Sequence, residues 1–270
     1  MTNEVMILML FTPKLFIMMK NIFIILLITF FNISVVTAQF SASVGYDLNL
    51  PTNQMALNIG AIHNFKVEGF IKMPENRWSF GMDLSVGGYG SKRDPIAFTQ
   101  GNTVTNTFVS VSNMVYGFKG LAQADLFSRD DRALMPYFHS GFGMTFFETS
   151  LTVEDPQDID NCRPLQSESL KSDQTWIASV GLGLRWHPKS SEGFYLDLRA
   201  TQNLGGKLNY MSLNPPTTSH LNHNNGADGT PVNVDFYNQQ TNIIHQHRIG
   251  TVYNSAVSFW GVQLQFAYQF

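Results

Sequence analysis

Apolar and polar residues alternate over most of the chain after residue 39, and this alternation limits the possible folds more than any other feature. The C-terminal segment, GVQLQFAYQF, has an apolar residue at every second position from Val262 to Phe270. Side chains at positions i and i+2 of a β-strand lie on the same face, so this segment predicts a strand with one apolar face. No part of the chain after residue 39 has a convincing helical period. Eight alternating stretches occur, over residues 40–50, 55–73, 78–90, 107–127, 136–153, 175–187, 194–213 and 248–270.

The connections between these stretches differ in length in a regular way. PTNQ, PENR, SRDDRALM and PKSSEG are short, whereas the connections over residues 92–106, 154–174 and 214–247 are long. If the strands are antiparallel and both termini lie at one end, all three long connections lie at the other end, together with the short PTNQ. Short turns at one end and long loops at the other are typical of outer-membrane barrels.

The apolar faces are suited to contact with lipid. Trp176 and Trp186 stand at the two ends of one apolar row, where transmembrane strands carry interfacial aromatic residues. The opposite face carries small residues such as Gly181 and Gly183, which fit a narrow interior. A soluble β-sandwich would alternate in the same way, but in lipid only a closed sheet leaves no unpaired edge. We therefore predict an all-β fold, an eight-stranded antiparallel transmembrane β-barrel over residues 39–270.

The composition of residues 1–38 is that of a secretory signal peptide. Lys20 precedes the apolar stretch 22–36, and the small-residue sequence VTA gives a cleavage site after residue 38. Met1 and Met19 are alternative starts for this peptide. An uncleaved N-terminal membrane helix is the other interpretation, because the apolar stretch is continuous enough to span a bilayer. We expect export through a cleaved signal peptide.

Taken together, the signal peptide, the eight amphipathic stretches and the terminal FAYQF resemble the small eight-stranded outer-membrane β-barrel family, with its OmpX-like and OmpA-type transmembrane domains. The resemblance covers nearly all of residues 40–270. It implies a barrel in the outer membrane of a Gram-negative cell, surrounded by outer-membrane lipid. It also implies that the barrel-assembly machinery recognises an aromatic C-terminal signal, here Phe266, Tyr268 and Phe270.

The alternation also predicts which charged side chains point into the barrel. Five acidic and five basic residues fall on the inward face, and an eight-stranded barrel has an interior just wide enough for side chains to fill. Unpaired charges away from bulk water are costly, so we expect these residues to pair and to close the lumen. A selective pore would carry an excess of one sign. The predicted lumen network consists of Asp47, Lys66, Glu68, Lys72, Asp83, Lys119, Asp125, Arg185, Asp197 and Arg199.

Candidate catalytic groups are few. Barrels of this size include enzymes that modify lipid A, and His139 precedes Ser140 in YFHSGFG. Adjacent residues of a strand point to opposite faces, so the two cannot act as base and nucleophile. We therefore predict that the protein is not an enzyme.

No cofactor or nucleic-acid partner is expected from the sequence. The formal net charge of −3 comes without a basic stripe, which argues against nucleic acid. The acidic run 154–160 lacks the pattern of a calcium loop, and the single cysteine, Cys162, cannot form an internal disulfide. Imidazole groups in one long loop are weak candidates for a metal site, although the favoured interpretation is a solvated loop: His220, His223, His245 and His247.

We expect a monomeric, non-enzymatic barrel with a plugged lumen, acting as a structural or interaction protein through its extracellular loops. Two alternatives remain open. One is an accessory subunit of an envelope protein-secretion or barrel-assembly complex, which would bring other envelope proteins as partners. The other is a conduit for small hydrophobic molecules.

Overall fold

The structure is a computed structural model that describes residues 39–73, 77–100, 103–127, 133–158, 164–188, 193–213, 229–238 and 243–270. The predicted signal peptide, residues 1–38, lies outside these ranges, as do Cys162, His220 and His223.

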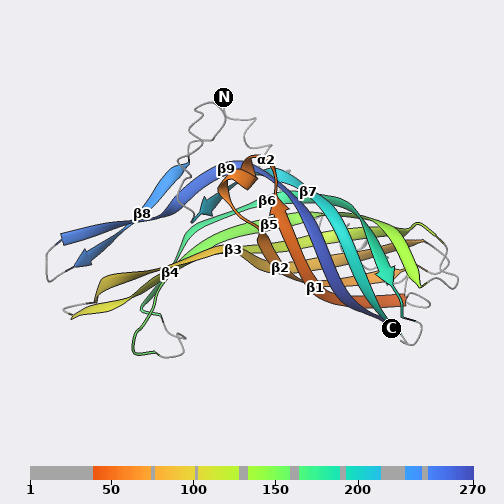
Figure 1. The fold of residues 1–270 in the computed structure, drawn as a ribbon, viewed down its shortest axis with the longest axis horizontal. Helices are drawn as coiled ribbons and strands as arrows, with labels where there is room; N and C mark the ends of the chain where they lie inside the picture. Colours follow the sequence, from red (N-terminus) through yellow and green to blue (C-terminus); the bar gives the residue numbers. More distant parts are fainter. Residues whose placement is uncertain are drawn as a thin grey trace, which may run out of the picture.

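Within the described ranges, eight strands form a closed ring and pair with their neighbours in antiparallel fashion (Figure 1). The ring closes between β1 and β9, whose register runs from Ser41↔Gln269 to Pro51↔Phe259. A further strand, β8, pairs with β9 beyond the ring. The predicted eight-stranded antiparallel barrel is therefore confirmed. The strands are β1 (Gln39–Pro51), β2 (Ile62–Lys72), β3 (Trp78–Gln100), β4 (Thr103–Asp125), β5 (Leu134–Val153), β6 (Gln166–Trp186), β7 (Phe194–Ser212), β8 (Thr230–Asn238) and β9 (Ile243–Gln269).

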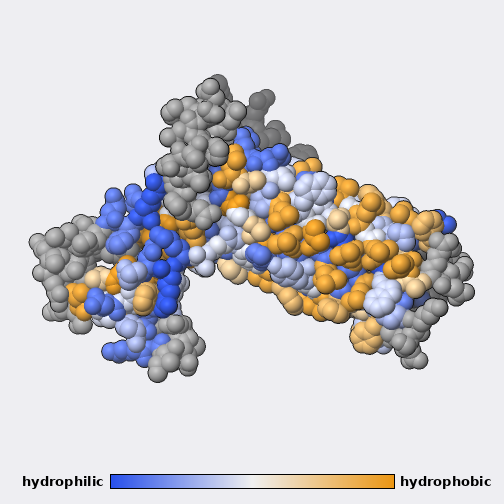
Figure 2. Space-filling view, in the orientation of Figure 1, coloured by the Kyte–Doolittle hydropathy of each residue, from blue (hydrophilic) through white to orange (hydrophobic). Residues whose placement is uncertain are grey.

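The barrel wall is apolar outside and polar inside. In β3, Met82 and Leu84 point outward with 61% and 59% of their surface exposed, whereas Asp83 between them is fully buried. Exposed aromatic side chains stand toward both ends of this outer belt, for example Trp186 on β6 and Trp260 on β9. Figure 2 shows apolar residues over the barrel and hydrophilic ones over the part of the molecule farthest from the C-terminus. This inverted arrangement is that of a wall solvated by lipid.

The two ends of the barrel differ. At the proximal mouth, where both ends of the described chain lie, the Gln269 side chain donates a hydrogen bond of 2.6 Å to that of Gln39. The connections after β2, β4 and β6 also lie at this mouth and are short. We call the opposite end distal; it carries the β3–β4 and β5–β6 hairpins, β8 and the only helix of the described ranges.

The prediction of one strand over residues 55–73 is wrong at its start. Helix α2 (Asn53–Asn58) comes first, and β2 begins only at Ile62. Ile59 would lie on the lipid-facing side if this stretch were one alternating strand, but it turns into the barrel and is 6% exposed. A short apolar alternation does not distinguish a strand from a single helical turn whose anchor is buried, here Met55. Among the helices of the described ranges, none is long and apolar enough to cross a membrane.

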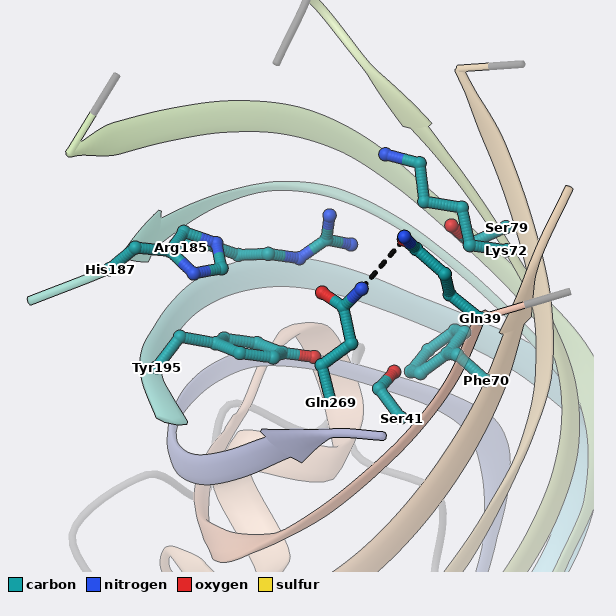
Figure 3. A pocket seen from close by; sticks show the side chains of 9 residues that line it. All are labelled: Gln39, Ser41, Phe70, Lys72, Ser79, Arg185, His187, Tyr195 and Gln269. Atoms are coloured by element: carbon teal, nitrogen blue, oxygen red, sulfur yellow. Dashed lines mark hydrogen bonds between the residues drawn. The ribbon is translucent and has the colours of Figure 1, made fainter. Parts of the chain in front are cut away.

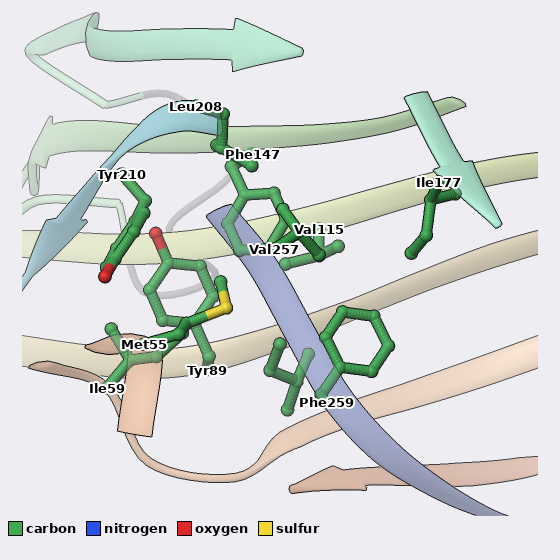
Figure 4. Close-up of a cluster of buried hydrophobic side chains, with 11 residues drawn as sticks. Met55, Ile59, Tyr89, Val115, Phe147, Ile177, Leu208, Tyr210, Val257 and Phe259 are labelled. Atoms are coloured by element: carbon green, nitrogen blue, oxygen red, sulfur yellow. The ribbon is translucent and has the colours of Figure 1, made fainter. Parts of the chain in front are cut away.

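An apolar cluster fills the distal part of the lumen (Figure 4). Met55 from α2 is fully buried in it, beside the rings of Tyr89 and Phe147, whose centroids are 5.4 Å apart. A β-bulge between Gly88 and Gly90 turns Tyr89 inward. We call this cluster the lumen plug: Met55, Ile59, Ile62, Tyr89, Val115, Phe147, Ile177, Leu208, Tyr210, Val257 and Phe259.

Strands extend into the long connections predicted over residues 92–106, 154–174 and 214–247, so the predicted strand ends are wrong there. β3 and β4 stay paired as far as Gln100↔Thr103, and β5 and β6 as far as Val153↔Gln166. β8 forms in the middle of the third connection. Inward-facing apolar residues on these extensions, such as Val109 and Val111, stabilise them by burial.

The extensions form two sheets that pack face to face. β6 and β7 pair only over Ile177↔Gly205 to Trp186↔Leu196, so β3 to β6 separate from β7, β9 and β8 beyond the barrel. We call this two-sheet unit the distal sandwich. Its core consists of Ile96, Val109, Val111, Leu151, Val153, Met211 and Ile249, with Phe98, Leu165, Leu170, Leu213, Val232, Val234 and Val252 packed around them.

Ile249→Ala tests whether the sandwich is held by this core. Ile249 is 2% exposed, so its truncation should lower the local free energy of unfolding by about 2–5 kcal/mol. Hydrogen exchange of the β8–β9 peptides measures this loss, and the barrel peptides should keep their protection. Val262→Ala, on the lipid-facing wall, is the control. Equal protection of β8–β9 in both variants would contradict a packed sandwich.

Candidate functional site

The ten charged residues assigned to the lumen from the sequence all point inward. Nine of them are at most 8% exposed, and the side chain of Lys72, at the proximal mouth, is 18% exposed. Alternation along each strand places them there, because each lies between two outward-facing neighbours. Every one has an oppositely charged partner within 4 Å, in two groups that are each neutral.

The first group joins β1, β2, β3 and β4. Lys66 Nζ lies 2.9 Å from Asp83 Oδ2 and 3.3 Å from Asp47 Oδ2. Lys119 Nζ lies 3.4 Å from Asp83 Oδ2. Two acidic and two basic side chains therefore neutralise each other across four strands.

The second group contains the most buried ion pair. Arg199 donates from Nη1 and Nη2 to the two carboxylate oxygens of Glu68, each at 3.0 Å, in a planar fork. Both side chains are at most 1% exposed. Arg199 also lies 3.5 Å from Asp197, which links this pair to the proximal part of the group.

The proximal part of the second group closes the barrel toward its mouth. Asp125 accepts from Lys72 Nζ at 2.5 Å and from Arg185 Nη1 at 2.7 Å. Arg185 Nε lies 3.8 Å from Asp197. Arg185 also donates to the side-chain carbonyl of Gln123. The group thus extends from the mouth to the centre of the barrel.

Tyr137 is a member of the network that sequence reasoning missed. Its hydroxyl donates to the carboxylate of Asp197, 2.6 Å from Oδ1, and accepts from Arg199 Nε at 2.8 Å. The Arg185 guanidinium stacks over its ring at 4.2 Å from the centroid. A Cβ on Gly183 would lie 2.1 Å from Tyr137 Cζ, so glycine is required there. The alternation of β5, which puts His139 inside, would have placed Tyr137 on the same face.

Gln263 joins the two groups. Its side-chain carbonyl accepts from Lys66 Nζ at 3.5 Å, and its amide donates to Glu68 Oε1 at 2.9 Å. The glutamines of the C-terminal strand therefore belong to the lumen, as its alternation indicated. The described lumen is closed by charge pairing on the proximal side and by the lumen plug on the distal side.

The proximal mouth leaves little free space (Figure 3). A cavity of about 20 Å³ lies there, bordered by side chains that include Lys72, Arg185 and His187. The hydrogen bond between Gln39 and Gln269 crosses it. This volume suits about one water molecule.

The structure separates the two residues that were weighed as catalytic. His139 is 2% exposed inside the lumen, whereas Ser140 on the outer face donates to the carbonyl of Ala122. His245 and His247 lie on β9, opposite Phe236 and Val234 of β8. His220 and His223 lie outside the described residues. In the described part of the chain, no cluster of three or more His, Cys, Asp or Glu side chains is placed to hold a metal ion.

The predicted assembly signal lies at the proximal mouth. Phe266, on the outer face of β9, is 64% exposed, and Phe270, directly after β9, is 71% exposed. The ring of Tyr268 packs edge-on against Phe270 and Phe194, with centroid distances of 4.8 and 4.7 Å. Their role in assembly stays a prediction.

The distal sandwich carries ion pairs and hydrogen bonds of its own. Glu154 accepts from Arg93 Nε at 2.8 Å and from Ser110 Oγ at 2.6 Å, and these bonds lower the pKa of its carboxyl group. Asp173 bridges the separated strands β6 and β7, since it accepts from the backbone N–H of Asn209 at 2.8 Å. That bond lowers the pKa of Asp173 as well.

Comparison with known proteins gives matches among solved structures only. The chain matches no protein-family model and has no significant match among curated proteins. Neisserial surface protein A (NspA) is similar over 86% of this chain and 97% of its own, with 8% identity and a TM-score of 0.38. Ail, the attachment invasion locus protein of Yersinia pestis, is similar over 86% and 100%, with 9% identity and a TM-score of 0.39. The outer membrane protease OmpT from Escherichia coli is similar over 86% and 96%, with 10% identity and a TM-score of 0.26.

The class of protein follows from the chain's own geometry. A closed ring of eight antiparallel strands, an exposed apolar belt and a polar, filled interior define a small transmembrane β-barrel of the outer-membrane type. The identities and TM-scores of the three matches are too low to add to this assignment.

Arg199→Met should destabilise the barrel by about 3–5 kcal/mol, because it leaves the Glu68 carboxylate buried without its partner. The double variant Arg199→Met, Glu68→Met should recover most of the loss, since it removes both charges. Urea unfolding of the folded barrel in lipid measures both. Arg93→Met, in an ion pair where Arg93 is 55% exposed, is the control and should cost about 1 kcal/mol or less. Equal losses for Arg199→Met and Arg93→Met would refute the importance of the buried pair.

The distal sandwich should weaken in acid before the barrel does. A carboxyl group with a lowered pKa in the folded state stabilises that state above its ordinary pKa, and the stabilisation is lost as the pH falls toward the lowered value. Protection factors of β3 and β6 peptides between pH 6 and pH 3 measure this loss. Glu154→Gln should reduce the pH dependence of the protection factors of the β3 peptides. An unchanged profile in that variant would rule out Glu154 as a source.

Proposed function

We propose that the protein is a non-enzymatic barrel of the Gram-negative outer membrane, with its termini in the periplasm and its distal sandwich outside the cell. Its role is that of a structural or interaction protein that works through the sandwich. The observation that carries this proposal is the double closure of the lumen, by the charge network and by the lumen plug.

A filled lumen leaves the outer surfaces as the places where the protein can act. The apolar belt is matched to outer-membrane lipid, and the assembly machinery is the expected partner of Phe266, Tyr268 and Phe270 during insertion. A conduit for small hydrophobic molecules through the barrel is disfavoured, since Met55 and Tyr210 of the plug are at most 1% exposed.

Membership of a larger envelope complex is the second candidate function, and one feature favours it. β8 is the last strand of its sheet, and β3 pairs with β2 only as far as His63↔Gly88. Both strands therefore present backbone edges in the distal sandwich. Exposed strand edges are sites at which a strand of a partner protein adds.

Planar-bilayer recording tests the closed lumen. The wild-type protein should give no stable single-channel steps, because neutral charge groups and an apolar plug both obstruct the barrel. Stable steps whose ion selectivity changes in Asp83→Asn would overturn the proposal. Asp94→Asn, in the distal sandwich, is the matched control for a change of charge outside the barrel interior.

Site-specific photo-crosslinking in intact cells tests the interaction role. A photoreactive residue in place of Asn233, exposed on β8, should form adducts with another envelope protein. The same residue in place of Leu182, 61% exposed on the lipid-facing wall, should give lipid adducts only. Absence of protein adducts from every exposed β8 position would count against a partner at this edge.

A further inference from the structure

The distal barrel wall has a gap above α2. β1 ends at Pro51 and β2 begins at Ile62, whereas their neighbours β9 and β3 continue into the distal sandwich. From Gly88 toward its distal end, β3 is no longer paired with β2. In the distal part of β9, up to Val252, β8 pairs with β9 on the edge that β1 occupies in the barrel. β3 and β8 lie close to each other but are not paired in the sheet order. The wall is therefore unpaired between β3 and β8.

A cavity of about 210 Å³ lies at this gap, between the lumen plug and the sandwich core. Ile59 and Tyr89 belong to the plug, and Leu213 packs against the sandwich core. The bulge in β3 sets Gly90 opposite the inward-facing Asn113, so Gly90 also faces the interior. The full lining is Ile59, Tyr89, Gly90, Ser91, Lys92, Asn113, Ser212 and Leu213.

The side chains of Asn113 and Ser212 already have hydrogen-bond partners. Asn113 Nδ2 donates to the carbonyl of Met211 at 3.0 Å, and its Oδ1 accepts from Thr149 at 2.7 Å. Ser212 Oγ donates to the carbonyl of Asn58 at 2.5 Å. The apolar part of the wall consists of Ile59, Leu213 and the ring of Tyr89, and this part can contact an apolar chain.

One charged group marks the rim. Lys92 is the only lining residue with a charged side chain. Its ammonium group lies 2.6 Å from the Asp94 carboxylate. The side chains of Lys92 and Asp94 are 41% and 33% exposed, so this ion pair is weak and open to exchange. An anionic head group can replace Asp94 as the partner of Lys92.

The gap also lies next to the apolar belt. Leu50 and Trp260 are paired in register near the distal end of β1. Their side chains are 46% and 54% exposed. Exposed Leu57 on α2 continues this apolar surface toward the gap. A molecule held in the outer leaflet can therefore reach the cavity sideways.

We infer that this cavity binds one short single-chain amphiphile with a carboxylate head. Its chain lies against Ile59, Leu213 and the Tyr89 ring between the plug and the sandwich, and its head pairs with Lys92. The volume is below the range of pockets for drug-sized ligands, which limits the occupant to one short chain. Ile59 of the lining belongs to the lumen plug together with the fully buried Met55, so the plug holds the ligand at the distal end instead of passing it through the barrel.

Equilibrium dialysis of radiolabelled octanoate against the barrel in phosphatidylcholine nanodiscs tests this inference, with empty nanodiscs subtracted. Wild type should bind octanoate saturably at one site. Gly90→Phe should weaken binding about tenfold or more, because its side chain fills the cavity. A Cβ at Gly90 meets only Asn113 Nδ2, at 3.8 Å, so the backbone tolerates the change. Gly60→Phe adds the same bulk where a Cβ has no neighbour within 4 Å, outside the lining, and should bind like wild type.

Lys92→Gln tests the head group. It should weaken octanoate binding about fivefold and leave octanol binding unchanged, since only the carboxylate uses the ammonium. Heat-modifiable migration in gels shows that each variant is folded. Binding that is not saturable in wild type, or that is equal in Gly90→Phe and Gly60→Phe, would overturn the inference. Octanoate binding unaffected by Lys92→Gln would overturn the carboxylate assignment. None of these outcomes depends on whether the lumen conducts or a protein partner exists.

Discussion

The forked ion pair between Glu68 and Arg199 is the interaction on which the rest of the structure depends. Both side chains are at most 1% exposed inside a wall whose outer face meets lipid, so no bulk water can solvate them. They are tolerated because Asp197, Tyr137 and Gln263 satisfy the remaining donors and acceptors. The same requirement explains why the lumen holds two neutral groups and small residues such as Gly183, which give the large side chains room.

The lumen plug and the distal sandwich extend this inverted architecture along the barrel axis. The interior changes from charged to apolar as the strands leave the membrane, because there the outside is water and the inside can be an ordinary core. Met55 inserts from α2 at this transition. The gap in the wall lies at the same level, since β1 and β2 stop where the lipid belt stops. The features that distinguish this barrel therefore gather at its distal end.

The sequence predicted the part of the fold that follows from strict alternation. The two-residue alternation alone predicted Asp83 inside the barrel and Leu84 outside, and the structure places them there. It could not predict α2, because Met55 obeys a two-residue spacing equally well in a strand and in one helical turn. Nor could it predict the sandwich, whose faces depend on the loss of pairing between β6 and β7 and on a bulge at Gly88, both set by partners far away in the chain.

The central claim is that the lumen is closed and dry at Glu68 and Arg199. Exchange of the Arg199 guanidinium protons with D₂O, followed by nuclear magnetic resonance on the barrel in lipid, tests it most directly. Arg93, exposed in the distal sandwich, provides the reference in the same sample. The account predicts that the Arg199 Nε proton, which is bonded to Tyr137, persists long after that of Arg93 has exchanged. Loss of both signals at the same rate would mean that water enters the lumen freely and would contradict it.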